Sequence, residues 1–172
     1  MKKTTIEKIN EVAAALMQKG TLIAPVKEDA GANFREIKDP QEIYLDYYNT
    51  VLSPKNIFLP QMEDFIKYKL TKSPSEAQQV ELNLQPAFLF GVRPCDVKSF
   101  EIMDIHFNAA GIVDPYWKAR RDNTTIIGYA FDLDSPPDQA DFYNTLSIGA
   151  ADPEGSDIFM VKRGNELLLK GI

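Results

Sequence analysis

One turn of the chain, Arg93-Pro94-Cys95-Asp96, combines residue types that chemistry often uses. Cys95 is the only cysteine, and it follows an apolar run that predicts a buried strand. A helix is predicted to begin here, and both a helix start and the neighbouring Arg93 favour the thiolate form. Arg93, Cys95 and Asp96 are therefore candidate functional residues, with Cys95 as a nucleophile, a redox thiol or a metal ligand completed elsewhere. The alternative is that Cys95 is a small buried residue filling a tight turn.

The remaining candidates do not complete a catalytic set. His106 is the only histidine, and an unbroken helix would place it about 16 Å along the axis from Cys95, which excludes a dyad within that helix. The sequence shows no glycine-rich phosphate loop, no metal-ligand spacing and no carboxylate pair that can be placed face to face. Tyr116, Arg120 and Arg121 either contact an anion or a partner, or form a solvated helix end. We therefore assign no catalytic residue and no metal ligand, and expect no self-sufficient enzyme.

The elements around the turn predict an α/β fold with a mixed sheet. Residues 87–92 and 124–131 are apolar runs, typical of strands buried on both faces. Between them, Asp96 is predicted to cap one helix and Asp114 a second. The resulting βαβ unit requires parallel strands with a right-handed crossover. It places the turn at the carboxyl end of a strand, where open α/β sheets bind ligands. Residues 157–169 predict a C-terminal β-hairpin.

The flanking segments predict further elements. Thr4 and Glu7 match a capping box for a helix that ends at Gly20. The other expected elements are a strand at 21–26, an exposed loop at 27–33, a short strand at 34–37, a helix start at Asp39-Pro40, an ordered loop at 53–60, a helix over 61–70 and a half-buried strand at 80–84.

Composition limits the function classes. The 172 residues suit one α/β domain, 1–172, with a sizeable core. A formal net charge of -6 argues against nucleic acid as the main partner, because phosphate binding needs a basic surface. The apolar runs are too short to span a bilayer, so we expect no membrane partner. One cysteine excludes an internal disulfide, and the cytoplasm is the default compartment.

Three segments also carry a resemblance to a known family: 53–63 (SPKNIFLPQME), 89–100 (LFGVRPCDVKSF) and 114–124 (DPYWKARRDNT). In order and approximate spacing they resemble the N-terminal region of the beta subunits of sulfhydrogenases and anaerobic sulfite reductases, which are dicluster ferredoxin-type electron-transfer proteins. The resemblance covers about residues 22–169. It implies that this region precedes a ferredoxin-like domain with two [4Fe-4S] clusters. It also implies that the partners are other subunits of an oxidoreductase complex.

The chain departs from this family at its cysteines. Family members carry a cysteine where this sequence has Phe131, and a Cys-Phe-Cys block where it has Asp141-Phe142-Tyr143. Cys95 alone cannot hold a cluster. We therefore expect no cofactor in this chain, with [4Fe-4S] clusters only in a downstream domain or partner. The chain is then the N-terminal domain of a longer iron–sulfur protein, or a stand-alone relative without clusters.

Two hypotheses of different classes follow. The first is a docking and scaffold domain of an electron-transfer subunit that is not itself redox active. The second is a small-ligand or thiol-dependent enzyme domain that uses the turn at Arg93–Asp96. For Cys95 we expect a packed sulfur, slow reaction with thiol reagents, and Phe131 or Tyr143 within reach of the 91–96 turn, because aromatic rings would fill the site of the lost cysteines.

Overall fold

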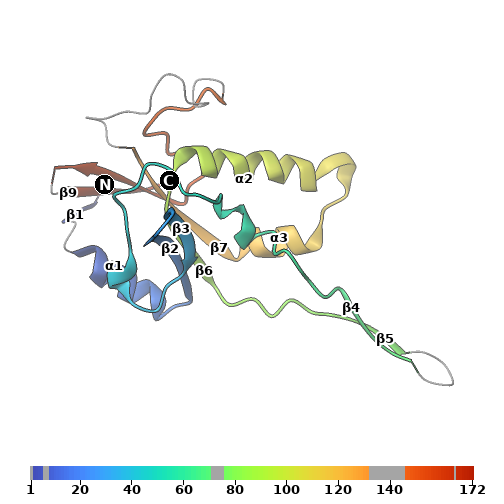
Figure 1. The fold of residues 1–172 in the computed structure, drawn as a ribbon. Helices are drawn as coiled ribbons and strands as arrows, with labels where there is room; N and C mark the ends of the chain where they lie inside the picture. Colours follow the sequence, from blue (N-terminus) through green and yellow to red (C-terminus); the bar gives the residue numbers. More distant parts are fainter. Residues whose placement is uncertain (1, 6–7, 71–75, 132–145, 165) are drawn as a thin grey trace.

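The central element of the computed structural model is a mixed sheet (Figure 1). The structure describes residues 2–5, 8–70, 76–131, 146–164 and 166–172. Within them, seven strands follow the order β1-β9-β8-β7-β6-β2-β3. The strands are β1 (Lys2–Thr5), β2 (Thr21–Glu28), β3 (Gly31–Glu36), β6 (Ala87–Val92), β7 (Thr124–Tyr129), β8 (Ile158–Arg163) and β9 (Glu166–Gly171).

The parallel centre of the sheet confirms the predicted βαβ unit. Strands β2, β6, β7 and β8 run parallel, and β6 pairs directly with β7, with Leu89 opposite Ile126. Both side chains are almost fully buried, at 0% and 1% exposure. The mostly apolar sequences of the two strands account for this burial on both faces. The predicted fold class is therefore confirmed, and the carboxyl ends of β6 and β7 lie side by side.

The ends of the chain meet at one edge of the sheet. The predicted C-terminal hairpin is confirmed as β8 and β9, which pair antiparallel and extend the sheet. Beyond them β1 pairs with β9, from Lys2 opposite Leu169 to Thr5 opposite Glu166. The expected helix start at Thr4 is therefore wrong, since α1 spans Ile9–Met17. Pairing with an edge strand satisfies the backbone of residues 2–5 better than a local cap could.

Helices cover the two faces of the sheet. α1 lies on one face, where Ile9 and Ala13 pack against Leu22, Phe90 and Leu167. α2 (Pro94–Phe107) and α3 (Pro115–Asp122) cover the other face, together with η3 (Pro54–Ile57) (Figure 1). The core of this second face holds, among others, Phe58, Leu89, Val97, Phe100, Trp117 and Ile126. Both predicted crossover helices are present.

The hairpin β2–β3 corrects one predicted loop. Residues 27–33 were expected to be an exposed loop, but β2 continues to Glu28 and β3 begins at Gly31. Gly31 has a φ of +138°, which an L side chain rarely adopts, so a two-residue connection is feasible there. The predicted cap at Asp39 is confirmed: its carboxylate accepts from the Gln41 amide at 2.9 Å, ahead of η2 (Pro40–Glu42).

The segment after η3 contradicts two further predictions. Residues 61–70 do not form a helix; β4 (Ile66–Lys69) and β5 (Glu76–Gln79) form a two-stranded antiparallel arm that projects from the body (Figure 1). Residues 80–84 form no strand either, and lead from the arm back to β6. The helical spacing of apolar residues in 61–70 gave the wrong prediction because no surface among the described residues buries those side chains. Within the described residues, no helix has the length and hydropathy needed to cross a membrane.

Candidate functional site

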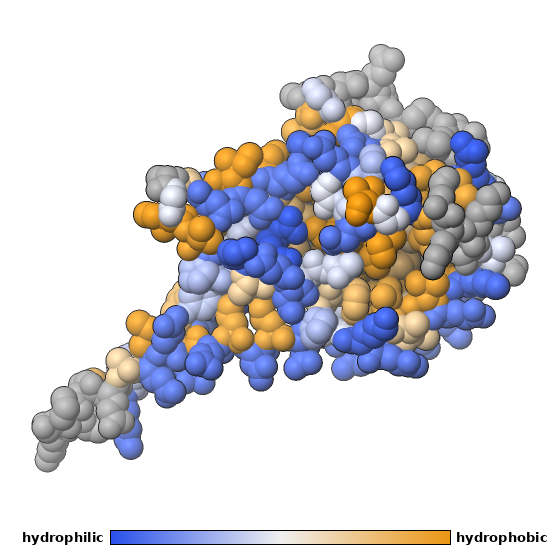
Figure 2. All heavy atoms as spheres, turned by 180° about the vertical axis from the view of Figure 1, so that it is seen from behind, coloured by the Kyte–Doolittle hydropathy of each residue, from blue (hydrophilic) through white to orange (hydrophobic). Residues whose placement is uncertain are grey.

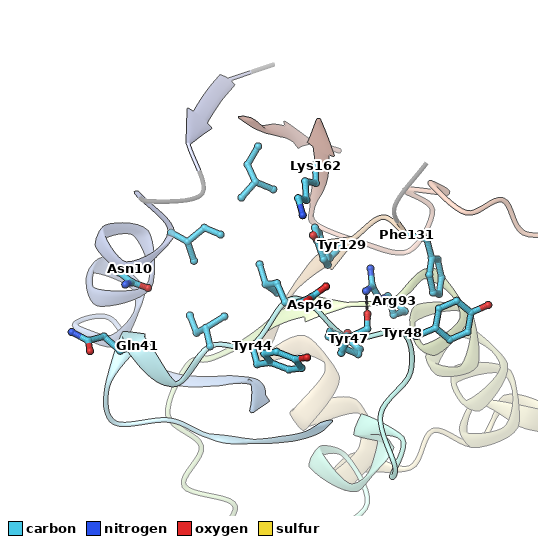
Figure 3. Close-up of a pocket in the computed structure, with 14 residues that line it drawn as sticks. Asn10, Gln41, Tyr44, Asp46, Tyr47, Tyr48, Arg93, Tyr129, Phe131 and Lys162 are labelled. Atoms are coloured by element: carbon cyan, nitrogen blue, oxygen red, sulfur yellow. Dashed lines mark hydrogen bonds between the residues drawn. The ribbon is translucent and has the colours of Figure 1, made fainter. Parts of the chain in front are cut away.

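A pocket of about 890 Å³ opens beside the carboxyl ends of β6 and β7, on the side of α1 (Figure 3). Its wall comes from α1, from residues 41–48, from the residues that follow β6 and β7, and from β8 and β9. We call it the Arg93 pocket. The side chains that matter most for its chemistry are Tyr44, Asp46, Tyr47, Tyr48, Arg93, Tyr129, Phe131 and Lys162.

Arg93 is built into the wall of this pocket. It directly follows β6, caps the backbone of α2, and is only 4% exposed. Its Nη1 donates to the carbonyl of Ala130 at 2.6 Å, and its Nη2 donates to the carbonyl of Tyr47. Both acceptors are backbone carbonyls, and the one on Ala130 directly follows β7. These bonds tie the 41–48 segment to the end of β7.

Three aromatic rings surround the Arg93 guanidinium. Its carbon lies 4.4 Å from the ring centroid of Tyr47, 4.7 Å from that of Tyr129 and 4.5 Å from that of Phe131. Cation–π contacts of this kind offset part of the cost of removing the charge from water. Among the described residues, the Arg93 Nε has no hydrogen-bond partner and no carboxylate lies within salt-bridge distance of the side chain. No contact among the described residues therefore neutralises the charge of this buried cation.

Tyr47 completes the connection to β6. Its hydroxyl donates to the carbonyl of Gly91 at 2.5 Å. Burial raises the pKa of the Tyr47 phenol well above its ordinary value, although the charge of Arg93 acts in the opposite direction. The phenol therefore stays protonated and keeps donating. Gly91 itself has a φ of +80°, and a Cβ there would lie 2.8 Å from Leu45, so the 41–48 segment fits closely only against glycine.

Cys95 lies behind the pocket wall. It is 6% exposed and packs with Phe131, while Ile148 and Ala150 complete this small cluster. The expected approach of Phe131 to the 91–96 turn is confirmed; Tyr143, with Asp141 and Phe142, lies outside the described residues. The position fits the packed interpretation of the sulfur. Slow labelling of Cys95 stays a prediction.

Asp96 does not cap α2, which corrects the sequence-based expectation. The helix begins two residues earlier at Pro94, whose fixed φ suits the first helical position, and Arg93 occupies the cap position. Asp96 instead accepts a hydrogen bond from the Ser53 hydroxyl at 3.0 Å. Burial raises the pKa of the Asp96 carboxyl, an effect opposed by the Ser53 bond and by the charges of Lys55 and Arg93. Asp96 thus joins α2 to the segment before η3.

The second candidate group lies on α3 and does not contribute to the Arg93 pocket. Arg120 forms an ion pair with Glu63, and the Arg121 Nη2 donates to the Asp104 carboxylate at 2.8 Å. The ring of Tyr116 contacts that of Phe65 edge-on, with centroids 4.8 Å apart. We call these contacts the arm base, because Glu63 and Phe65 immediately precede β4. An anion contact at Tyr116, Arg120 and Arg121 stays a prediction.

Most residues of the pocket were not predicted from the sequence. Tyr44, Asp46, Tyr47 and Tyr48 belong to the segment 44–48, and Lys162 comes from β8. The available signal was the concentration of three tyrosines in five residues. Three tyrosines so close together are unusual in a connecting segment, and they indicate a segment that could line a site with aromatic rings.

The side chains present do not fit an iron–sulfur cluster. A [4Fe-4S] cluster takes four thiolates in the usual case, and the chain has one cysteine. That cysteine packs against Phe131. Among the described residues, no three His, Cys, Asp or Glu side chains are grouped as metal ligands. These residues therefore supply too few thiolates to hold such a cluster.

Comparisons with known proteins give one curated relative. The chain matches no protein-family model, and no solved structure matches it. It is 30% identical over 146 residues to sulfhydrogenase 2 subunit beta of Pyrococcus furiosus. The matched region covers 84% of this chain and 40% of the relative, so the chain spans well under half the length of that protein. The resemblance predicted from sequence is thereby confirmed: most of this chain is similar to part of a sulfhydrogenase beta subunit.

Proposed function

We propose that this chain is a docking and scaffold domain of an iron–sulfur electron-transfer subunit, of the hydrogenase or sulfite reductase beta type, in the cytoplasm. Its partners are the other subunits of an oxidoreductase complex. Its own side chains carry no electron, and [4Fe-4S] clusters belong to a downstream domain or to a partner. The similarity to a protein named as a sulfhydrogenase subunit supports the electron-transfer context.

The observation that carries the docking role is the arm, defined as residues 62–70 and 76–79. It stands clear of the body, as Figures 1 and 2 both show. Several large apolar side chains on it are exposed: Met62 at 91%, Phe65 at 50%, Ile66 at 62%, Tyr68 at 68% and Leu70 at 79%. Two strands alone are marginally stable in water. Burial of each such side chain would contribute about 1.5–3 kcal/mol, so a partner surface stabilises the arm.

The arm has two distinct faces. Because side chains alternate along a strand, Ile66 and Tyr68 share one face of β4, and Lys67 and Lys69 share the other. The apolar face is suited to a partner surface and the basic face to solvent. Clustered exposed apolar side chains of this kind mark interaction sites.

The base of the arm is fixed to the body. Glu63 pairs with Arg120 of α3, and Phe65 packs on Tyr116. Ile66, the first residue of β4, pairs with Gln79, the last residue of β5, and the Val80 amide donates to the Phe65 carbonyl at 3.0 Å. A fixed base sets the direction of the arm, which lowers the entropy lost when the arm docks.

A second candidate function is a small-ligand domain that uses the turn at Arg93–Asp96. The Arg93 pocket favours the ligand-binding part of this alternative, because it is large and lined with rings and charged groups. Nothing favours the thiol-dependent part, since Cys95 is only 6% exposed.

Co-purification tests the docking role. The full chain is co-expressed with the hydrogenase-type subunits of its own organism, as wild type and as the double variant Ile66→Ser with Tyr68→Ser. We expect the named subunits to co-purify with the wild type and to be lost with the double variant. The matched control, Lys67→Gln with Lys69→Gln, changes the other face of β4 and should retain them.

Results of two kinds, from co-purification and from absorption, would contradict the proposal. One is recovery of the wild-type chain without any of these subunits, or equal recovery with both double variants. The other is broad iron–sulfur absorption in the visible spectrum of the chain purified alone under anaerobic conditions, because that would place a cluster on these residues.

A further inference from the structure

We propose that the Arg93 pocket binds a small anionic ligand that carries a planar ring, with a carboxylate or a phosphate as its anionic group. This inference goes beyond the docking role and does not depend on it, because the arm and the pocket are built from different elements. The ligand chemistry follows from three features of the pocket: its size and place, its charge, and its rings.

Size and place suit a small molecule. The volume of about 890 Å³ lies within the range of about 300–1,000 Å³ typical of ligand sites. The pocket lies beside the carboxyl ends of the parallel strands β6 and β7, where open α/β sheets place their ligands. Figure 3 shows its labelled side chains converging from α1, from the 41–48 segment and from the strand ends.

The charged groups of the pocket favour an anion. Among the described residues, two cations, Arg93 and Lys162, and one carboxylate, Asp46, line it. The formal charge of these residues is positive in a chain whose net charge is -6. Among the described residues neither cation has a carboxylate within salt-bridge distance. A buried guanidinium without a contacting counter-ion creates a positive potential, and an incoming anion would lower its cost.

The two cations have different roles. Arg93 is a positioning residue: its Nη1 and Nη2 already bind the carbonyls of Ala130 and Tyr47, and it holds the wall in place while supplying charge. Lys162 is only partly buried and has a long flexible stem that reaches into the pocket from β8 (Figure 3). We assign the direct contact with the anionic group to the Lys162 ammonium, which can donate up to three hydrogen bonds.

The rings favour a flat ligand. Tyr44, Tyr48, Tyr129 and Phe131 line the pocket, and Tyr48 lies against Phe131 with centroids 5.4 Å apart. A planar ring can stack on such side chains, and each aromatic pair contributes beyond the area that it buries. The hydrogen bonds of Arg93 and of the Tyr47 hydroxyl hold the rings around Arg93 in place. This aromatic surface is therefore formed before the ligand arrives.

A second hollow among the described residues provides a contrast. It lies near the arm base and holds Arg121 and Lys118, each of which is already paired, with Asp104 and Asp122 respectively. Its cations are therefore neutralised by the chain itself. An anion gains little there, so the inference is confined to the Arg93 pocket.

Titration calorimetry of the full chain with matched probes tests the proposal. The probes are benzoate with benzyl alcohol, adenosine monophosphate with adenosine, and inorganic phosphate. We expect at least one of the two ring anions to bind, and to bind about tenfold or more tightly than its neutral counterpart, as a charge-assisted hydrogen bond implies. The pair that shows the difference identifies the anionic group as carboxylate or phosphate.

Variants locate the binding. Lys162→Gln should weaken the ring anion by about tenfold and leave its neutral counterpart unchanged, while Tyr44→Ala should weaken both. Lys67→Gln removes a lysine from the arm and should change neither. The proposal is overturned if neither ring anion binds, if neutral and anionic probes bind equally, if phosphate binds as tightly as the ring anions, or if Lys162→Gln has no effect.

Discussion

The Arg93 pocket and the arm base use the same residue type in opposite ways. In both, an arginine lies over aromatic rings: the guanidinium carbon of Arg93 is 4.4 Å from the centroid of Tyr47, and that of Arg121 is 5.4 Å from that of Phe58. The rings alone therefore do not distinguish the two regions. The hydrogen-bond acceptors do.

At the arm base both arginines face carboxylates, whereas Arg93 faces carbonyls. Arg120 pairs with Glu63, and Arg121 pairs with Asp104, which also accepts from the indole of Trp117 at 2.6 Å. Carbonyl oxygens satisfy a donor without cancelling its charge. An arginine paired with a carboxylate fixes structure: Arg120, through Glu63, fixes the direction of the arm. An arginine held by carbonyls keeps a positive electrostatic potential that can act on an incoming anion.

The largest expected difference between the regions is in stability. Arg93→Met removes two buried hydrogen bonds and leaves the carbonyls of Ala130 and Tyr47 without donors, so we expect the free energy of unfolding to fall by about 3–5 kcal/mol. Arg121→Met should cost about 1–2 kcal/mol, because Asp104 keeps its bond from Trp117 and remains partly hydrated. Urea denaturation measures both. Equal losses would show that acceptor type does not separate the regions.

A smaller effect is expected for one tyrosine in each region, Tyr47 at the Arg93 pocket and Tyr116 at the arm base. Tyr47→Phe leaves the buried carbonyl of Gly91 without its donor, and we expect a loss of about 1–3 kcal/mol. Tyr116→Phe should change stability by no more than about 0.5 kcal/mol, because its hydroxyl makes no hydrogen bond to the described residues. Thermal unfolding of both variants measures these two changes in stability. A loss for Tyr116→Phe as large as that for Tyr47→Phe would count against the comparison.

The smallest effect concerns Asp96, next to the pocket wall. Burial raises the pKa of this carboxyl above its ordinary value of 3.8, so the folded protein binds the proton more strongly than the unfolded chain. Stability contributed by the protonated form is therefore present below pH 3.8 and is lost as pH rises through the raised native pKa. As the pH rises from 3.8 through the raised native pKa, the wild type should lose stability relative to Asp96→Asn, whose side chain can still accept from Ser53. Parallel pH–stability curves for the two proteins would contradict it.

The parallel core was predictable because its signal is local. Residues 87–92 and 124–131 are mostly apolar and contain no charged residue, as is typical of strands buried on both faces. The arm was not predictable in the same way. Met62, Phe65 and Ile66 recur at helical spacing, yet they remain exposed and no core selects the helix.

Part of the Arg93 pocket was predictable from the sequence, again because its signal is local. The position of Arg93 follows from the strand before it, so the turn could be singled out. Its partners could not, since the carbonyls of Ala130 and Tyr47 are 37 and 46 residues away. Only the folded topology brings the 44–48 segment, the end of β7 and β8 to one place. Cap prediction failed at Asp96 because Pro94 can begin the helix earlier.

Hydrogen–deuterium exchange of the full chain, alone and in complex with the co-expressed subunits, tests the central claim most directly. We predict that complex formation protects the arm, residues 62–70 and 76–79, more than any other described segment. Residues 44–48, in the wall of the Arg93 pocket, should exchange at the same rate in both states. Unchanged exchange in the arm, or protection confined to residues 44–48, would show that docking does not use the arm and would contradict the proposed role.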